Sequence, residues 1–315
     1  MAGIQYGYAL NQFKVQESDL VQRPPKETVL KIVSVCGFRG VEMTSDALGG
    51  PSQIESTFGS VHNFADFLHS CGIDCVCSFF GSSGGPGGGF GGLPGASGGG
   101  SPANAQERTI EAMRPIAAFL HDLGGSCLVV RPLGSYVQEA PVTEAKIRNA
   151  AELWTKVGMM TKQYGIQTAM HIDFGCAIHE MADIDKLLEL SDPNFVGLAL
   201  DTAELAIAGI DPIVLYEKHH TRVKHFHFKD ALVADTLGEY KTDGSLLTTG
   251  GSREIERWFY EMGTPKGMVN FPALMKSINQ HNYEGWIVAE SDQSPHVEES
   301  AMLNGWYVKQ VLSRA

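Results

Sequence analysis

Short apolar runs alternate with helix-like segments along almost the whole chain of 315 residues. Each run has the length and composition of a strand that is covered on both faces of its sheet. Eight such runs can be placed, at Ile4–Leu10, Gly40–Thr44, Asp74–Phe80, Ser126–Pro132, Gln167–Phe174, Phe195–Asp201, Arg222–Lys229 and Gly285–Glu290. Helices are expected between them, at Lys26–Cys36, Val61–Cys71, Gln106–Leu123, Thr143–Tyr164, Met181–Leu190, Pro212–His219 and Phe271–Asn282. This alternation predicts an α/β protein with a closed (β/α)8, or TIM, barrel in a single domain over residues 1–315.

Two segments interrupt the alternation. Residues 81–104, after the third strand, consist mainly of glycine, serine and proline, and residues 231–270 follow the seventh strand. Both are expected to be enlarged loops over the C-terminal rim of the barrel. The first could be a mobile lid or a tolerated insertion, and either could instead contact another subunit. The alternative fold, an open doubly wound sheet, is disfavoured because no phosphate-binding glycine turn follows the first strand.

Four predicted strands in the second half of the chain end on side chains that bind metals, namely His171, Asp201, His227 and Glu290. In a parallel barrel the carboxyl ends of all strands converge on one rim, so these side chains are expected to lie together. Taken alone, each could be a hydrogen-bonded core residue. As a group they would be costly to bury without a cation. Histidine and carboxylate ligands suit Mn²⁺, Mg²⁺, Co²⁺ or Zn²⁺, and the pattern predicts a metal-centred active site.

The overall charge and the cysteines narrow the classes of partner and compartment. A formal net charge of −12 disfavours nucleic acid as a partner, because that affinity comes largely from lysine and arginine. The six cysteines lie in or beside apolar runs, which is typical of free thiols in a reducing compartment. Neither a secretory signal nor an apolar run of membrane-spanning length is apparent. We therefore expect a cytoplasmic protein without a membrane partner.

The chain resembles the sugar isomerase/epimerase superfamily with a xylose isomerase-like barrel, which also includes inosose dehydratase and an apurinic endonuclease branch. The resemblance spans about residues 36–312 and is strongest after residue 165. Its motifs are Gly40-Val-Glu-Met, Val196-Gly-Leu-Ala-Leu-Asp-Thr-Ala-Glu-Leu, His225-Phe-His-Phe-Lys-Asp, Gly267-Met-Val-Asn-Phe-Pro and Tyr283-Glu-Gly-Trp-Ile-Val-Ala-Glu-Ser-Asp. The endonuclease branch is excluded, because it needs histidines at the ends of strands two and three, where this chain has Glu42 and Ser78.

The resemblance implies Asp201, His227 and Glu290 as metal ligands, and it places His171 where the family usually has a ligating glutamate. That departure weakens a two-glutamate epimerase mechanism. The stretch His171-Ile-Asp-Phe-Gly is more similar to the His-x-His-x-Gly form of the inosose dehydratase-like branch. A second departure is Glu204, which stands where the family usually has histidine.

The family's shared chemistry implies a divalent-metal-dependent isomerase or epimerase that removes a proton beside the carbonyl of a keto-sugar or cyclitol. A lyase that uses the same site is the alternative, and a non-catalytic barrel subunit is less favoured. The expected cofactor is Mn²⁺, with Mg²⁺, Co²⁺ or Zn²⁺ as alternatives, and a homo-oligomer is expected. The catalytic candidates are Glu290 as ligand and base, with Glu204 or His171 as second acid or base.

The implied substrate-binding group lies at the ends of strands two, four, five and seven. For Glu42 and Arg131, on strands two and four, the alternative is a core or surface salt bridge. For two members, Asp173 and His225, the alternative role is to orient the metal ligands. For Lys229 a structural pair with Asp230 is the favoured alternative to substrate contact. The group comprises Glu42, Arg131, Asp173, His225 and Lys229.

Overall fold

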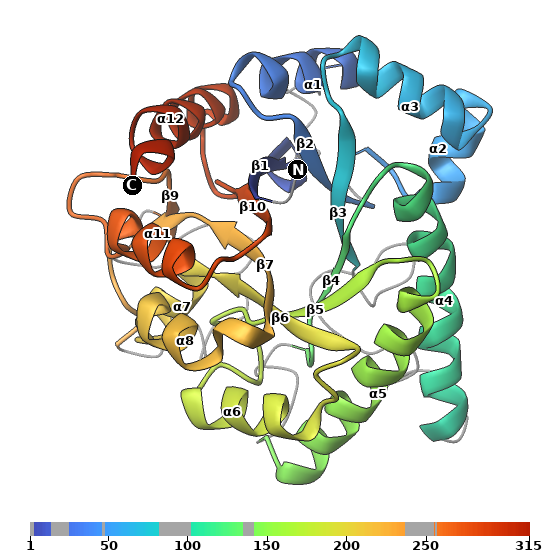
Figure 1. The fold of residues 1–315 in the computed structure, drawn as a ribbon, viewed down its shortest axis with the longest axis vertical. Helices are drawn as coiled ribbons and strands as arrows, with labels where there is room; N and C mark the ends of the chain where they lie inside the picture. The colour runs from blue at the N-terminus through green and yellow to red at the C-terminus, as the bar shows by residue number, and fades with distance from the viewer. Residues whose placement is uncertain are drawn as a thin grey trace.

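The structure is a computed structural model, and it describes residues 3–13, 25–45, 48–81, 102–134, 142–236, 255 and 257–315. In these residues eight parallel strands close into a barrel in the order β1-β10-β7-β6-β5-β4-β3-β2. Figure 1 shows the strands at the centre and the helices in a ring around them. The strands are β1 (Ile4–Ala9), β2 (Gly40–Thr44), β3 (Cys75–Gly81), β4 (Cys127–Val130), β5 (Gln167–His171), β6 (Val196–Asp201), β7 (Val223–Phe228) and β10 (Gly285–Ala289). The predicted (β/α)8 barrel is confirmed.

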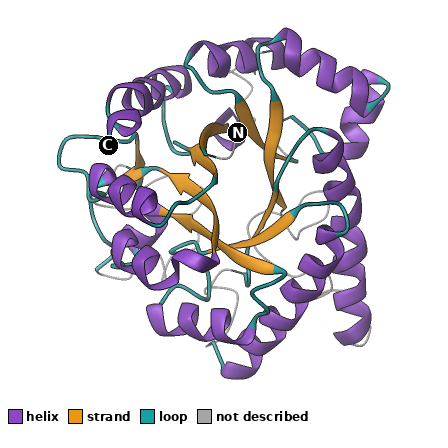
Figure 2. Cartoon of the chain, viewed as in Figure 1, coloured by secondary structure: helices purple, strands orange, loops and turns teal. Residues whose placement is uncertain are grey.

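All seven predicted helices are present, with ends that shift by a few residues. Figure 2 shows the helices in purple around the orange strands. They are α1 (Lys26–Val35), α3 (Val61–Ser70), α4 (Pro102–Asp122), α5 (Glu144–Lys162), α6 (Met181–Leu190), α8 (Pro212–His219) and α11 (Phe271–Gln280). No helix within the described ranges is both long enough and apolar enough to cross a membrane.

Three further helices in the described part of the chain were not predicted from the sequence. They are α2 (Pro51–Phe58), α7 (Thr202–Ile207) and α12 (Val297–Gln310). Helix α7 is entirely buried, so it lacks the alternation of apolar and polar faces that marks a surface helix. Helix α12 reverses the usual pattern, because it buries Ser300 and Asn304 while it exposes Leu303 and Trp306.

The two predicted loops are described only in part. Residues 82–101 of the glycine-rich segment lie outside the described residues, so its role as a lid stays a prediction. The second segment is described at residues 231–236, 255 and 257–270. There β8 (Asp230–Ala231) pairs antiparallel with β9 (Phe259–Tyr260).

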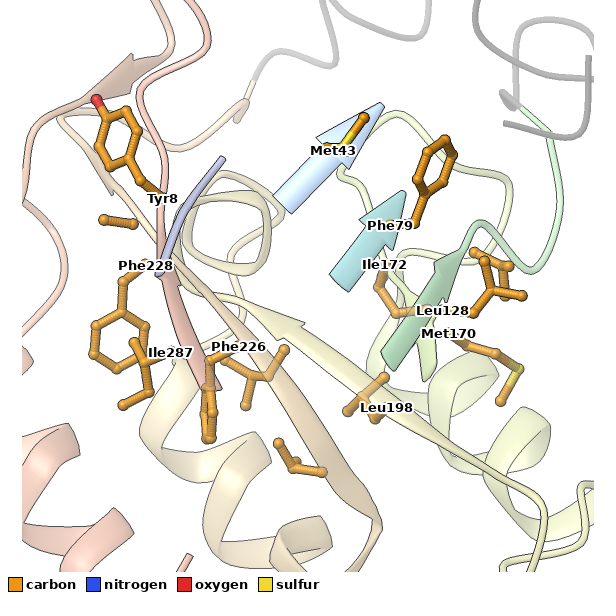
Figure 3. Close-up of a cluster of buried hydrophobic side chains, with 14 of the residues drawn as sticks. Tyr8, Met43, Phe79, Leu128, Met170, Ile172, Leu198, Phe226, Phe228 and Ile287 are labelled. Carbon is orange, nitrogen blue, oxygen red and sulfur yellow. The ribbon is translucent and has the colours of Figure 1, made fainter. Parts of the chain in front are cut away.

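Alternation along each strand separates the core of the fold from the site. Outward side chains such as Met170, Leu198 and Phe226 belong to the main apolar cluster between the strands and the helices (Figure 3). Inside the barrel, one small apolar cluster contains Ala169 and Ala199 and another contains Trp286. The remaining inward positions at the carboxyl ends of the strands carry polar side chains.

Helix α5 packs closely against the beginning of β6, the strand that carries Asp201. A Cβ atom at Gly158 would overlap the backbone carbonyl of Phe195, which immediately precedes β6. The absence of a side chain at this position therefore allows the helix to approach the strand.

We predict that Gly158→Ala destabilises the protein, although a glycine-to-alanine change inside an exposed helix usually stabilises by about 1 kcal/mol. Overpacking against a fixed carbonyl should instead cost about 1–3 kcal/mol and lower the melting temperature. Gly3→Ala is the control, because a Cβ there meets no described atom within 4 Å. A melting temperature for Gly158→Ala at or above that of the unmodified protein would contradict this packing argument.

Candidate metal centre

Three neighbouring strands bring His171, Asp201 and His227 together inside the barrel. In the paired strands Asp201 is in register with His227, and β5 lies on the other side of β6. The Oδ2 atom of Asp201 is 3.1 Å from His171 Nε2 and 3.7 Å from His227 Nδ1. All three side chains are at most 2% exposed. The barrel thus joins residues that are separated in the sequence by up to 56 positions, from 171 to 227.

Glu290, directly after β10, completes the group that the sequence predicts as metal ligands. Its Oε2 atom is 3.4 Å from His227 Nδ1, and its Oε1 atom accepts a hydrogen bond from the Asn11 amide. Asn11 follows β1 and was not predicted as a site residue. The strand-end rule that identified the other residues would also have identified Asn11.

The donor atoms fit a divalent cation. Ligand atoms about 2.0–2.2 Å from a shared tetrahedral ion lie roughly 3.4 Å from one another. The separations at this centre are 3.1, 3.4 and 3.7 Å. Moreover, the buried Nδ1 atom of His227 has no hydrogen-bond partner in the described part of the chain. His171, Asp201, His227 and Glu290 could therefore hold such an ion.

Asp201 also caps a helix, and this contact fixes the orientation of its carboxylate. Its Oδ1 atom accepts the backbone N–H groups of Ala203 and Glu204, each at 3.0 Å, and so caps helix α7. Its other oxygen is left to face the histidines. Burial alone would raise the pKa of Asp201, but the Lys229 ammonium and the hydrogen bond from His171 hold that pKa well below its usual value.

Lys229 places a buried ammonium against the same carboxylates. Its Nζ atom lies 3.0 Å from Glu290 Oε2, 3.1 Å from Asp201 Oδ2 and 3.4 Å from Glu204 Oε1. Burial would lower the pKa of Lys229, yet the surrounding carboxylates raise it well above its ordinary value. The alternative pairing with Asp230 is not what the structure has, because Asp230 accepts the backbone N–H groups of Ala231 and Val269 instead.

Glu204 lies beside this lysine in a different electrostatic environment. One of its oxygens accepts the backbone N–H of Phe174 at 2.9 Å. Burial, together with the nearby charges of Asp173 and Asp201, raises the pKa of Glu204 well above its usual value. Two buried carboxyl groups with pKa values shifted in opposite directions, Asp201 and Glu204, favour one ionised group and one neutral acid.

Four of the five predicted substrate-binding residues form two contact groups next to His171 and His227, and the fifth is Lys229. Asp173 forms an ion pair with Arg131, and its Oδ1 atom is 3.0 Å from His171 Nδ1. Glu42, which is 1% exposed, contacts the Nε2 atoms of His225 and His227. These contacts within the protein do not test whether the five residues bind a sugar, so that role stays a prediction for all of them.

Two further residues at the site were missed by the sequence reasoning. Ser78 donates a 2.8 Å hydrogen bond to Glu42, with which it is in register on the neighbouring strand. The register of two inward positions could have indicated this pair. The ring of Phe259 lies 4.0 Å from Lys229 Nζ, but it belongs to the irregular segment after β7, where the sequence offers no comparable signal.

Comparison with known proteins agrees with this architecture. Residues 30–305 match the family model described as xylose isomerase-like TIM barrel. The chain belongs to the xylose isomerase-like TIM barrel family. The resemblance inferred from the sequence motifs is thereby confirmed, and the aligned region includes every residue of the centre described above except Asn11.

Relatives in the xylose isomerase-like family include an inosose dehydratase from Clostridium beijerinckii, which is 31% identical over 205 residues, or 61% of this chain and 67% of that protein. Across three inosose dehydratases the match spans 60% to 67% of the relative's length. A solved structure of the IOLI protein with a bound zinc atom has a TM-score of 0.67 at 13% identity, covering 98% of each chain. An L-ribulose 3-epimerase structure also has a TM-score of 0.67, at 15% identity over 100% of this chain and 95% of that chain. At these identities the two structures show the fold alone.

We predict that Lys229→Met destabilises the metal-free protein, because it leaves buried carboxylates without their ammonium partner. Removal of one partner from a buried ion pair typically costs about 3–5 kcal/mol. Added Mn²⁺ or Zn²⁺ should restore much of the melting temperature by supplying positive charge. The matched control is Lys31→Met, which removes an exposed lysine paired with Glu27 on α1. A loss of stability that neither metal reverses would contradict a cation-balanced centre.

Proposed function

We propose that the protein is a divalent-metal-dependent carbohydrate enzyme whose first chemical step removes a carbon-bound proton beside the carbonyl of a keto-sugar or cyclitol. The observation that carries this proposal is the buried group of His171, Asp201, His227 and Glu290 at the carboxyl end of the barrel. When bound there, a divalent cation would act as a Lewis acid that polarises the carbonyl of the substrate. We expect Mn²⁺, with Mg²⁺, Co²⁺ or Zn²⁺ as alternatives.

The roles of the carboxyl groups follow from their surroundings. Glu290 is the proposed base, because its carboxylate lies at the centre and is oriented by Asn11 and Lys229. Glu204 is the proposed acid, since burial raises its pKa well above the usual value and so favours the protonated form. Phe174 holds the Glu204 carboxyl in place through its backbone N–H.

After proton removal, elimination of a β-hydroxyl group is the second chemical step that the site favours. The departing hydroxyl needs a proton, and a neutral carboxyl such as Glu204 can donate one. The inosose dehydratase relatives, which are carbohydrate enzymes, support the same assignment. We therefore propose a lyase of the dehydratase type.

Isomerisation or epimerisation is the second candidate. It is favoured by one specific observation, namely that Glu290 and Glu204 both lie within 3.4 Å of the same Lys229 ammonium. Two carboxyl groups so close together could remove a proton and return it to another carbon or to the opposite face.

The compartment and the assembly are also proposals. A cytoplasmic location is supported by the cysteines, all six of which lie in the described ranges and are free. A homo-oligomer is supported by helix α12, which exposes Met302, Leu303 and Trp306 by 55% to 60%. Acidic Glu299 lies before this apolar stripe and basic Lys309 after it. An antiparallel two-fold pairing of α12 would bring these opposite charges together around the apolar centre.

The reaction can be identified with the metal-loaded protein, inososes and ketoses in D₂O. We predict loss of water with an enone absorbance for a lyase, and deuterium incorporation without loss of water for an isomerase or epimerase. Glu290→Gln should slow every outcome about 10²- to 10⁴-fold, as expected for removal of a general base. Glu204→Gln should retain proton exchange but block elimination. Full activity in Glu290→Gln, or no reaction of any substrate with the metal-loaded protein, would contradict the proposed function.

We predict that Trp306→Glu converts the oligomer to a monomer, because it puts a charge at the centre of the apolar stripe on α12. Light scattering coupled to size-exclusion chromatography measures the mass directly. Met159→Glu is the matched control, since Met159 is 49% exposed but lies on α5. A monomeric unmodified protein, or an unchanged mass in the Trp306 variant, would contradict pairing through α12.

A further inference from the structure

The imidazole ring of His227 lies between carboxylates on both of its nitrogen sides. Its Nδ1 atom faces Glu290 and Asp201, at 3.4 and 3.7 Å. Its Nε2 atom is 2.9 Å from Oε1 and 3.0 Å from Oε2 of Glu42. His227 is fully buried, and Glu42 is 1% exposed. Glu42 therefore contacts the ring nitrogen that does not face the candidate metal centre.

Glu42 is itself held in place from two further directions. The hydroxyl group of Ser78 donates to Glu42 Oε2 at 2.8 Å. The Nε2 atom of His225 lies 3.2 Å from the same oxygen. Both of these side chains are fully buried, so water does not compete for the carboxylate.

The direction of these hydrogen bonds fixes where the proton of His227 resides. An ionised carboxylate can only accept hydrogen bonds, so an imidazole nitrogen that is hydrogen-bonded to it must carry the proton, as Nε2 of His227 does toward Glu42. The Nδ1 atom has no hydrogen-bond partner in the described part of the chain. A neutral His227 is then protonated at Nε2, and the lone pair is left at Nδ1. That lone pair is directed at the side of the ring where Asp201 and Glu290 lie.

We propose that Glu42 is a positioning residue that fixes the tautomer and orientation of His227, so that Nδ1 is the metal-ligating atom. Glu42 accordingly acts through His227 rather than on a sugar hydroxyl, one of the two roles that the sequence analysis gives it. This inference rests on the proposed metal site. It parallels the contact between Asp173 and His171 Nδ1, which likewise places a carboxylate behind a candidate ligand.

A second cation between Glu42, His225 and His227 is the competing explanation. Ligand atoms of these three residues also lie within 4.8 Å of one another. In that case a metal ion would replace the protons between the carboxylate and the two rings. The inference requires one tightly bound ion per chain, and a second one at this position would overturn it.

The state of His227 can be read directly from protein labelled with ¹⁵N-histidine. Long-range ¹H–¹⁵N correlation spectra of the metal-free and Zn²⁺-loaded protein distinguish the two ring nitrogens, and His227→Gln assigns the resonances. We predict a protonated Nε2 in both states, with Zn²⁺ shifting only the Nδ1 resonance. Zinc on Nε2, or an unprotonated Nε2 without metal, would overturn the role of Glu42 alone. A protein that keeps the Nε2 proton but binds no zinc would overturn the metal site, and with it any role of Glu42 toward a metal.

Metal affinity measured by chelator competition gives an independent readout. We predict that Glu42→Gln weakens Zn²⁺ binding about 10- to 100-fold, the usual effect of removing a partner of a metal-binding histidine. Ser78→Ala should cause a smaller loss, because the carboxylate remains but loses one donor. If the Glu42 variant does not fold, the Zn²⁺ affinity of Ser78→Ala tests the proposal instead.

The matched control is Asp230→Asn, which neutralises another buried carboxylate that accepts only backbone N–H groups. We expect its Zn²⁺ affinity to be unchanged. If the Glu42 and Ser78 variants lose thermal stability while their folded forms bind Zn²⁺ as tightly as the unmodified protein, then Glu42 has only a structural role and the proposal fails.

Discussion

Charge balance inside the barrel is the constraint on which the rest of the site depends. A barrel interior is a poor solvent for ions, so buried carboxylates need compensation by cations or protons. The described residues supply two permanent cations at the site. Arg131 pairs with Asp173, and Lys229 is shared between Asp201, Glu204 and Glu290. Asp292 also contacts this ammonium, at 3.5 Å. Because one ammonium cannot neutralise four carboxylates, burial raises the pKa of Glu204 and of Asp292, which favours their protonated forms.

The packing of the fold and the chemistry of the site are tied together by the two-residue period of the strands. On β7 the inward residues are His225 and His227, whereas the outward Phe226 and Phe228 pack against Tyr216 and Phe271 of the helical layer. A register shift by one residue would place phenylalanine in the centre and histidine in the apolar core. The aromatic contacts outside the barrel therefore hold the imidazoles inside it.

The sequence was sufficient to predict the barrel and to predict that the four strand-end residues lie together. The reason is that the carboxyl ends of all strands in a closed parallel barrel meet at one rim. It was not sufficient to assign contacts. Lys229 was paired with its sequence neighbour Asp230 as an alternative, but consecutive residues in extended chain point in opposite directions. For Glu42 the choice between a sugar hydroxyl and a salt bridge stayed open, because a strand-end rule does not distinguish the open rim from the interior.

The same limit explains helix α12, which the sequence pattern did not indicate. Its buried face carries Ser300 and Asn304, whose side chains hydrogen-bond to Glu261 and Ser291 respectively. Its exposed face carries Trp306. A polar residue can be buried where other side chains satisfy its hydrogen bonds, as they do for Ser300 and Asn304. Polarity alone therefore does not predict which face of this helix is buried.

His171 shows how such partners decide chemistry as well as packing. A glutamate at this position could serve as a second base, but the imidazole has each ring nitrogen within 3.1 Å of a carboxylate oxygen, from Asp173 and from Asp201. A ring held at both ends is suited to ligation and poorly suited to moving a proton to and from a substrate. Under the proposed function, the second proton transfer then falls to the neighbouring Glu204, whose pKa is raised by burial. An imidazole held at both nitrogens and a buried carboxyl group with a raised pKa are therefore the two features of this site that suit the proposed elimination.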